Sequence, residues 1–357
     1  MRHLKNYYYQ FTHWETWDWR IKYIPLVPLW LRHCIRSGSW WFFTSSNPTL
    51  AFGGFEGETK QAIYKHLPTG SYPKSIFISP EEDFPNIQKR IETDFNYPFV
   101  AKPNVGRMGY MFRIIYSAAQ LQHYHTSMCV DYLVQDLITY PLEVSVFYYR
   151  FPGEQKGIIT GFVKKENLTV TGDGKSTLLE LMRHCINVPF RLKEMESKHR
   201  ENLNIILKKD DVYALSNALN LSRGGKLISL EHEKDERLLN VFNDLSIYSK
   251  TLFFGRYDIK CASIEALKKG QEFSILEYNG CGAEPHHVYG NGNTLVRACM
   301  ILAKHWNILF KISRYNHKNG APYYSFKRGW KEMMECRKHF AALKKLDKDF
   351  PMFRADK

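Results

Sequence analysis

Two short apolar segments carry polar residues at positions where a core strand would have hydrophobic ones. One segment contains Arg256 and Asp258, and a later one contains Glu277 and Asn279. Because successive side chains of a strand point to opposite faces, each pair is expected to share one face. Asp258, Glu277 and Asn279 are oxygen donors of the kind that bind Mg²⁺ together with substrate phosphates. Arg256 would add a fixed positive charge beside the metal.

An earlier segment has the composition of a phosphate-binding loop. The predicted strand 97–103 contains Lys102, and Gly106 and Gly109 follow it. Glycines allow a tight loop to present successive backbone N–H groups to phosphate oxygens, and a lysine adds positive charge. An ordinary hairpin turn is the alternative interpretation of each piece taken alone.

Taken in order, these segments resemble the ATP-grasp superfamily, and within it the D-alanine–D-alanine ligase and cyanophycin synthetase branches. The resemblance covers roughly residues 59–305, and segments 172–181 and 220–225 support the second branch. It implies an α+β fold in which two α+β subdomains grip ATP. Residues 59–135 would form the smaller subdomain with its glycine-rich lid, and 136–305 the larger one with the metal site.

The resemblance also implies a role for each matching residue. The nucleotide-binding set is Lys60, Lys102, Gly106, Gly109, Gln135, Asp136, Leu137, Ile138 and Glu143. Gln135 would meet the adenine amino group, the backbone of the three residues after it would contact the rest of the base, and Glu143 would bind the ribose. Arg256 and Lys102 would act in catalysis, and Asp258, Glu277 and Asn279 would hold Mg²⁺, with Mn²⁺ as an alternative.

Four further residues are candidates for substrate contact: Lys175, Arg223, His286 and His287. The stretch around Lys175 looks like a P-loop, but Thr169 stands where that motif requires glycine. A turn leading into a helix capped by Ser176 or Thr177 is the alternative. Either histidine could be a general base for an amine or a hydrogen-bonded structural residue.

The resemblance implies an ATP-dependent enzyme that joins a small-molecule carboxylate to an amine through an acylphosphate, with ADP and phosphate as products. Two alternatives remain open. One is an ATP-grasp kinase, in which a hydroxyl group accepts the phosphoryl group and no ligation follows. The other is a membrane-surface binding protein with a degenerate nucleotide site.

The segments on either side of the motifs have unusual compositions. Residues 1–58 stand in place of the βαβ domain with which most ATP-grasp ligases begin, and they include six of the eight tryptophans: Trp14, Trp17, Trp19, Trp30, Trp40 and Trp41. These rings either cover the fold or face a membrane surface and a lipid-borne substrate. In the basic tail, 306–357, the pattern predicts an amphipathic helix over 325–348, which either docks on the protein by its apolar side or lies on a membrane surface.

The net charge of +14 favours an anionic partner. No zinc-finger spacing or RNP-like motif accompanies the charge, so nucleic acid is not favoured. Seven dispersed cysteines indicate a reducing cytosol. The apolar stretch 23–35 is shorter than the ~20 residues of a membrane span, and Pro25 and Pro28 interrupt it. A cytoplasmic location is expected, with the inner face of a membrane as the alternative.

Overall fold

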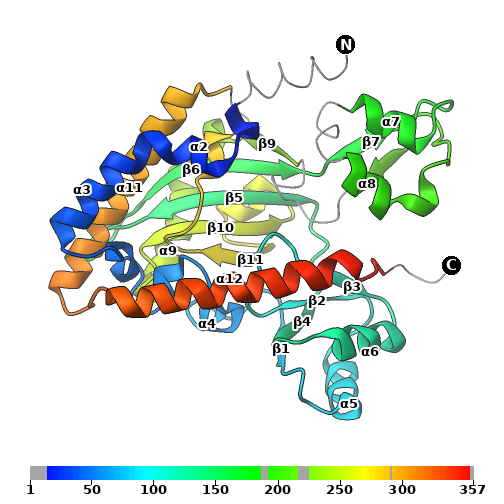
Figure 1. Cartoon of the computed structure of the whole chain (residues 1–357), viewed down its shortest axis with the longest axis horizontal. Coiled ribbons are helices and arrows are strands. Elements are labelled where there is room, and N and C mark those ends of the chain that lie inside the picture. Colours follow the sequence, from blue (N-terminus) through cyan, green and yellow to red (C-terminus); the bar gives the residue numbers. More distant parts are fainter. Residues whose placement is uncertain (1–13, 186–191, 216–224, 290–291, 354–357) are drawn as a thin grey trace.

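Two antiparallel sheets and the helices packed on them form the structure, a computed structural model of the chain (Figure 1). It describes residues 14–185, 192–215, 225–289 and 292–353. Every strand pair within these ranges is antiparallel, and helices and sheets are mixed along the chain. The predicted α+β class is confirmed.

The smaller sheet has the spatial strand order β1-β4-β2-β3 in the described chain. Its strands are β1 Ser75–Ile78, β4 Tyr132–Asp136, β2 Phe99–Pro103 and β3 Arg113–Ile115. Helices α5 (Phe84–Asp94) and α6 (Ala118–Ser127) share a hydrophobic core with it. β2 is buried along its whole length, so Lys102 is a charged residue within an otherwise apolar strand.

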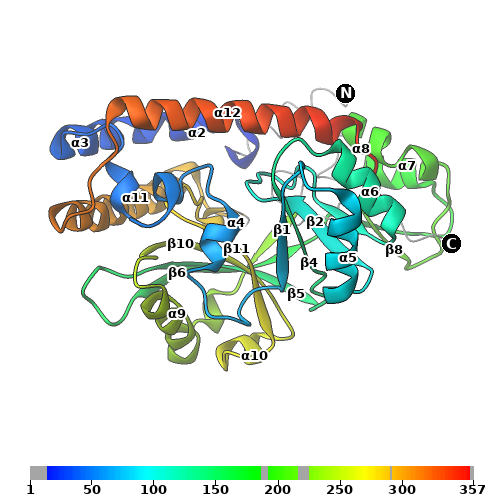
Figure 2. The ribbon, with the colours of Figure 1, turned by 90° about the horizontal axis from the view of Figure 1, so that it is seen from below.

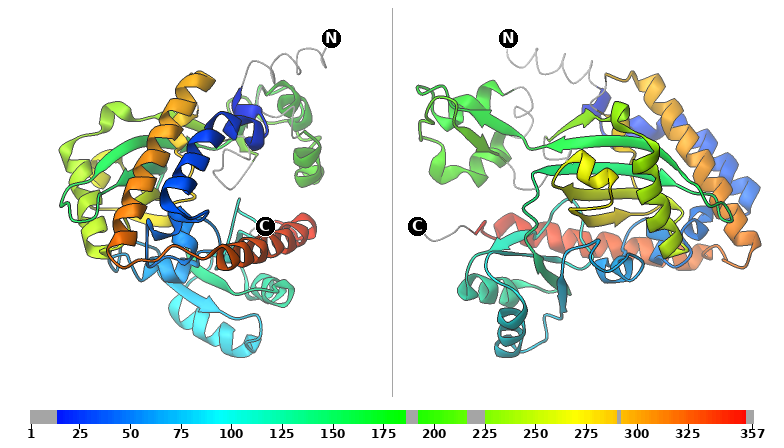
Figure 3. Two further views of the ribbon diagram at one scale, coloured as in Figure 1. Left: turned by 60° about the vertical axis from the view of Figure 1, so that its left-hand side comes forward. Right: turned by 180° about the vertical axis from the view of Figure 1, so that it is seen from behind.

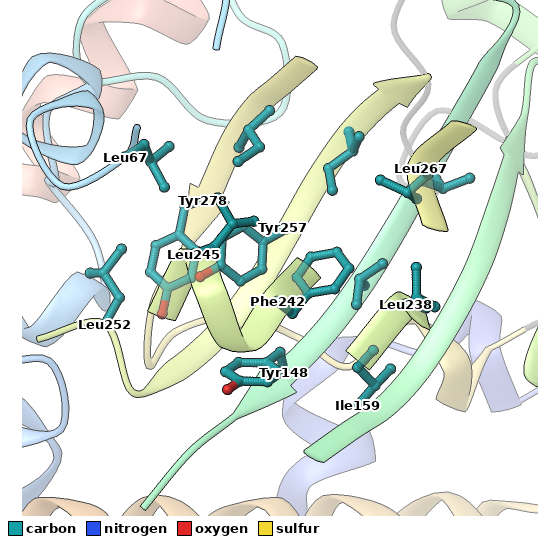
Figure 4. Close-up of a cluster of buried hydrophobic side chains, with 14 of the residues drawn as sticks. Leu67, Tyr148, Ile159, Leu238, Phe242, Leu245, Leu252, Tyr257, Leu267 and Tyr278 are labelled. Atoms are coloured by element: carbon teal, nitrogen blue, oxygen red, sulfur yellow. The ribbon is translucent and has the colours of Figure 1, made fainter. Parts of the chain in front are cut away.

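The larger sheet has the order β11-β10-β5-β6-β9. Its strands are β11 Phe273–Asn279, β10 Phe254–Cys261, β5 Leu142–Tyr149, β6 Ile158–Glu166 and β9 Lys226–Ser229. Helices α9 (Glu236–Ser249) and α10 (Ile264–Lys268) pack on one face through Phe242, Tyr257, Tyr278 and their neighbours (Figure 4). The residues between these core positions therefore face the opposite side.

The N-terminal segment packs mostly as short helices against the larger sheet and α11 (Leu295–Lys318). Its helices are η1 Trp14–Thr16, α2 Trp19–Tyr23, η2 Ile24–Leu26, α3 Val27–Ser37, η3 Phe42–Ser45 and η4 Ala51–Gly54. Trp14 stacks on Tyr289, Trp30 packs on Trp306, and Trp41 is buried. These three rings cover the fold, which was one of the two interpretations of the aromatic composition.

The C-terminal helix α12 (Phe326–Asp349) agrees to within one residue with the predicted helix, and it is docked on the protein. Figure 2 shows it running from the N-terminal segment across to the smaller sheet. At one end the Trp41 indole donates to the Phe326 carbonyl at 3.1 Å. At the other end Arg113 pairs with Asp347 at 2.9 Å, both largely buried.

A small unit with its own core stands at one end of β6 and β9, apart from the larger sheet (Figures 1 and 3). It contains β7 Thr169–Thr171, α7 Leu178–His184, α8 Leu192–Lys198, η6 Arg200–Asn202 and β8 Val212–Ala214. Thr177 and Glu180 form a capping box at the start of α7, which confirms the turn-and-cap alternative to a P-loop. The remaining short helices are α4 Lys60–Tyr64, η8 Glu231–Glu233 and η9 His286–Val288.

Candidate active site

The pairing of β10 with β11 brings four predicted residues together. Arg256 lies opposite Asn279, and Asp258 lies opposite Glu277. Side chains at directly opposed positions stand on the same face of a sheet, with Cβ atoms about 4.5–5.5 Å apart. The prediction of a shared face is therefore confirmed. We call this side of the larger sheet the site face.

Asp258 is surrounded by hydrogen-bond donors. Its Oδ1 accepts from Ser145 Oγ at 2.7 Å and Arg256 Nε at 3.2 Å, and it forms an ion pair with Lys165 Nζ at 2.9 Å. Its Oδ2 accepts from Arg256 Nη2 at 3.0 Å and Asn279 Nδ2 at 3.1 Å. Burial alone would raise the pKa of this carboxyl, but Arg256 and Lys165 hold it far below its usual value. The carboxylate stays ionised and anchors both cations.

Lys165 is a site residue that sequence reasoning missed. It lies on β6 opposite Glu143 of β5, and its ammonium is 3.2 Å from Glu143 and 2.9 Å from Asp258. Burial raises the pKa of Glu143 even with this cation beside it. Strand alternation shows that either Lys164 or Lys165 must point to the site face. The register with β5, which the sequence does not give, determines which one.

Two buried lysines stand at the edge of the site face. Lys60 on α4 is 3.7 Å from Glu277, and Lys102 on β2 is bonded to the carbonyl of Leu276 at 3.4 Å. Burial and the neighbouring charge of Lys60 lower the pKa of Lys102 to about 7. A Cβ atom added to Gly106 would lie 3.2 Å from the Lys60 ammonium, so the loop after β2 runs directly over this lysine.

That loop, residues 104–112, is called the glycine loop here. Gly109 has a φ of 71°, a conformation that glycine adopts without strain. Arg107 pairs with Glu56 at 2.6 Å, and His339 of α12 donates to the carbonyl of Val105 at 2.8 Å. The N-terminal segment and α12 therefore both hold the loop.

Gln135 lies on β4 and is buried, and its Oε1 has no hydrogen-bond partner in the described parts of the chain. Leaving such an acceptor unpaired costs about 1–3 kcal/mol, so a ligand N–H would find a ready partner here. Asp136, Leu137 and Ile138 follow as half-buried residues. The carbonyl of Ile138 accepts from Lys260, a further cation on β10.

The substrate candidates differ in their positions. His286 Nδ1 is 3.2 Å from Ser145 Oγ, whose own proton goes to Asp258, so the histidine is the donor. Burial holds the pKa of His286 well below its usual value. His287 lies against Gly161, and burial lowers its pKa to about 3. Lys175 is exposed on the separate β7–β8 unit, and Arg223 lies outside the described residues.

The N-terminal segment supports the site through backbone contacts that the sequence did not suggest. The N–H groups of Cys281 and Gly282 donate to the carbonyls of Gly53 and Gly54 at 3.2 Å. A Cβ atom on Gly54 would lie 2.8 Å from the Cα of Gly280, so only glycine allows this approach. The segment thereby fixes the turn that follows Asn279.

Part of the predicted metal set has free oxygen donors. No group of three or more His, Cys, Asp or Glu side chains within the described ranges could hold a metal alone. The Glu277 side chain is 37% exposed, and Asn279 donates through its nitrogen, which leaves its oxygen for a ligand. These two residues suit an Mg²⁺ ion that takes its other ligands from phosphates and water. The oxygens of Asp258 already accept five hydrogen bonds or ion pairs.

No family model matches the chain, and no curated protein matches it. Several solved structures do. A bifunctional glutathione synthetase from Pasteurella multocida is 16% identical with a TM-score of 0.40, over 71% of this chain and 36% of that one. A D-alanine–D-alanine ligase from Bacillus anthracis is also 16% identical, with a TM-score of 0.42 over 73% of this chain and 69% of that one. The D-alanine–D-alanine ligase from Coxiella burnetii is 9% identical with a TM-score of 0.41, over 82% of this chain and 64% of that one.

These solved structures are ATP-grasp ligases, the superfamily that the sequence motifs resemble. This chain spans about a third of the length of the glutathione synthetase. The chain is similar to ATP-grasp ligases.

Proposed function

We propose that this protein is an ATP-dependent ligase that joins a carboxylate to an amine and releases ADP and phosphate. The observation that carries the proposal is the grouping of Lys60 and Lys102, both buried, with Gly106 and Glu277. Within the described chain the 3.7 Å contact to Glu277 is the only ion pair of either lysine. A polyphosphate would neutralise both ammonium groups and accept N–H bonds from the glycine loop.

The remainder of ATP has matching partners in this proposal. Gln135 Oε1 would accept from the adenine amino group, and the backbone of Asp136, Leu137 and Ile138 would bind the ring edge. Glu143 binds Lys165 through Oε1. Its other oxygen would accept from a ribose hydroxyl. A bound nucleotide would thus pair the buried amide oxygen of Gln135.

Glu277 and Asn279 would hold Mg²⁺, or Mn²⁺. Asp258, the proposed third ligand, would join them by exchanging one of the five contacts that its oxygens accept for the ion. The ion would neutralise phosphate charge so that an anionic carboxylate could approach. Asp258 has a second role that its contacts support directly, which is to hold Arg256 and Lys165 in place.

Arg256 is fixed from two sides, by Asp258 and by the carbonyl of Glu284 at 2.8 Å. A guanidinium held in this way can stabilise charge on the transferred phosphoryl group without moving. The substrate carboxylate would attack the γ-phosphorus, and the bond to ADP would break with the electron pair leaving on ADP. An amine would then attack the acylphosphate carbon, lose a proton, and displace phosphate.

His286 is the proposed acceptor of the amine proton. Its Nδ1–H donates to Ser145, so the unprotonated nitrogen is Nε2. A base with a lowered pKa removes a proton only as the new C–N bond forms and the amine becomes acidic. His287 packs beside His305, at 5.3 Å between ring centroids, and is a structural residue in this proposal. A cytoplasmic location, where ATP is available, is part of this proposal.

The test is to supply the full chain with ATP, Mg²⁺ and pooled amino acids, amines and carboxylates, and to measure phosphate and ADP release. Hydroxylamine in a parallel sample would convert an acylphosphate into a hydroxamate. A ligase gives both phosphate and hydroxamate, and Lys102→Ala should abolish them while the matched surface variant Lys156→Ala keeps them. ADP formation without phosphate release would identify the kinase instead. Absence of nucleotide binding would favour the degenerate site.

A further inference from the structure

The outward side of η2 and α3 is aliphatic, and α2 adds Ile21, which is 51% exposed. Ile24, Val27, Leu31 and Ile35 are 62%, 48%, 43% and 81% exposed. Their spacing of three, four and four residues places them along one side of a helix. The other side of this segment, including Leu26 and Cys34, is buried in the fold. A helical segment with apolar residues on its outward side as well as its buried side is expected to contact a second apolar surface besides the protein core.

The neighbouring helix extends this surface. Figures 1 and 3 show α3 and α11 side by side at one edge of the molecule. Trp30 packs on Trp306, and His33 stacks on Phe310 at 4.3 Å. On α11, Val296 and Met300 are 69% and 68% exposed. Two packed helices therefore both direct large apolar side chains outward.

Both helices come from segments without acidic residues. Residues 19–55 contain four Lys or Arg, and residues 285–331 contain eight, with no Asp or Glu in either. The whole chain has 36 acidic residues in 357, about one in ten, so the depletion is local. Arg32, Arg36, Arg297 and Lys304 of α3 and α11 are all exposed, whereas the exposed Arg20 of α2 pairs with Asp18 at 3.1 Å. The apolar surface thus has a basic border.

We propose that the face formed by α2, η2, α3 and the N-terminal half of α11 binds the surface of an anionic membrane. We call it the lipid face. Its aliphatic side chains would enter the headgroup region, and its arginines and lysines would meet lipid phosphates. No helix in the described chain is long and apolar enough to cross a membrane, so this is attachment at the surface. Trp14, Trp30 and Trp41 pack inward, so these three rings are not part of the lipid face.

Two other occupants fit the same surface less well. A second copy bound through this face about a twofold axis would bring two surfaces with an excess of positive charge together. A nucleic acid would satisfy the basic border but would leave Ile24, Leu31 and Ile35 without apolar partners. An anionic bilayer surface satisfies both kinds of side chain.

The test is co-sedimentation of the full chain, without nucleotide, with phosphatidylcholine vesicles alone or with added phosphatidylglycerol. The protein should bind the anionic vesicles at about 50 mM salt and lose most of the binding at about 500 mM. Leu31→Ser with Ile35→Ser should weaken binding roughly tenfold or more, since about 0.8 kcal/mol is lost for each CH₂ group no longer buried. Arg32→Gln with Lys304→Gln should weaken it by roughly tenfold or more as well.

Matched control variants remove the same kinds of side chain from other parts of the protein surface. Ile206→Ser with Val212→Ser removes two exposed aliphatic residues of the β7–β8 unit, and Lys89→Gln with Lys156→Gln removes two exposed charges. Both controls should bind like the unmodified protein. Vesicle binding is measured without ATP, so a negative result would leave the proposed ligase reaction unaffected.

Three results would overturn the proposal. The first is no binding to anionic vesicles at low salt. The second is equal loss in the lipid-face variants and the controls, or full binding by the Leu31 and Ile35 variant, either of which would indicate unspecific charge attraction. The third is that the same variant converts a dimer to a monomer in sedimentation velocity, or loses DNA binding while keeping vesicle binding. Either outcome would assign the face to another occupant.

Discussion

Asp258 and Glu277 have the same side-chain charge and opposed positions, but different surroundings. Asp258 is buried and neutralises two cations, whereas Glu277 is partly exposed and has one contact at 3.7 Å. Removing one partner of a buried ion pair leaves an uncompensated charge, and this costs about 3–5 kcal/mol. The two residues therefore affect stability differently even if both are needed for turnover.

The first prediction follows from this contrast. Asp258→Asn should abolish ATP turnover and lower the free energy of unfolding by about 3–5 kcal/mol, because Arg256 loses its counter-charge and Lys165 keeps only Glu143. Glu277→Gln should abolish turnover with a stability change within about 1 kcal/mol. Phosphate release and urea unfolding measure the two effects. Near-normal turnover in either variant at saturating Mg²⁺ would contradict the metal assignment.

The second prediction concerns the proton on Lys102. Its pKa of about 7 lies below that of an unfolded-state lysine, so the unfolded chain binds more protons between pH 7 and 10. The unliganded protein should therefore gain stability as pH rises through this window. Phosphate favours the charged amine, so ATP binding near pH 8 should take up a proton, by up to about one per site.

Calorimetry in buffers with different ionisation enthalpies measures this uptake. It should vanish in Lys102→Met and persist in Lys156→Met, whose lysine is exposed. The Lys102 variant should also bind ATP far more weakly while adenosine binding changes little. Equal losses for ATP and adenosine would exclude a phosphate contact.

At the level of elements, the segment between η4 and α4 contains a carboxyl in an unfavourable place. Burial raises the pKa of Glu58 to about 8, and its Oε2 has no partner among the described residues. The unfolded carboxyl ionises near pH 4.3, so the folded state loses stability as pH rises from there to about 8. The nearby charge of Glu332 on α12 adds to this effect.

The third prediction is that Glu58→Gln raises the melting temperature at alkaline pH. The difference between variant and unmodified protein should grow from pH 5 to 8 and then level off, because the ionised carboxylate is the destabilising form. Thermal unfolding of both proteins between about pH 5 and 9 measures the difference in melting temperature. A constant difference at all pH values would show that the carboxyl is not the titrating group.

Strand alternation made the site face predictable. Arg256 and Asp258 are two residues apart on β10, and Glu277 and Asn279 are two apart on β11, so each pair was expected to share a face. The register between the two strands, which places Asp258 opposite Glu277, comes from the structure. The helix over 325–348 was predicted equally well from its periodicity. Lys165 was missed because its orientation depends on pairing with a distant strand. The aromatic N-terminal segment was ambiguous because rings suit both a core and a membrane surface.

On the scale of the whole molecule, α12 joins parts of the protein that are distant in sequence. It contacts Trp41 at one end, the glycine loop through His339, and the smaller sheet through Asp347. Asp347 also accepts from the backbone N–H of Met111 at 2.8 Å. The position of the glycine loop therefore depends on how α12 is docked.

The fourth prediction is that Asp347→Ala destabilises the protein by about 3–5 kcal/mol, because the buried Arg113 loses its ion-pair partner. Asp349→Ala removes the same charge from an exposed position of the same helix and should have an effect below about 0.5 kcal/mol. Urea unfolding compares the two variants. Equal effects would show that net charge rather than this contact is responsible.

The lipid face and the site face are connected. The Tyr23 hydroxyl of α2 donates to the Glu284 carboxylate at 2.9 Å, and the backbone carbonyl of Glu284 accepts from Arg256. A protein attached to a membrane through α2 and α3 would keep this end of the site near the headgroups. A lipid-borne carboxylate or amine is then a natural candidate for one of the two substrates.

The N-terminal segment is synthesised long before the residues against which it packs. Trp41 bonds to Phe326, and Asn316 donates to the carbonyl of Ser45, across sequence separations of 285 and 271 residues. At a translation rate of about 5–20 residues per second, roughly 15–55 s pass before these partners leave the ribosome. During that interval the tryptophans and phenylalanines of the segment have no core to enter. The nascent chain therefore offers chaperones, or a nearby bilayer, more apolar surface than the finished protein does.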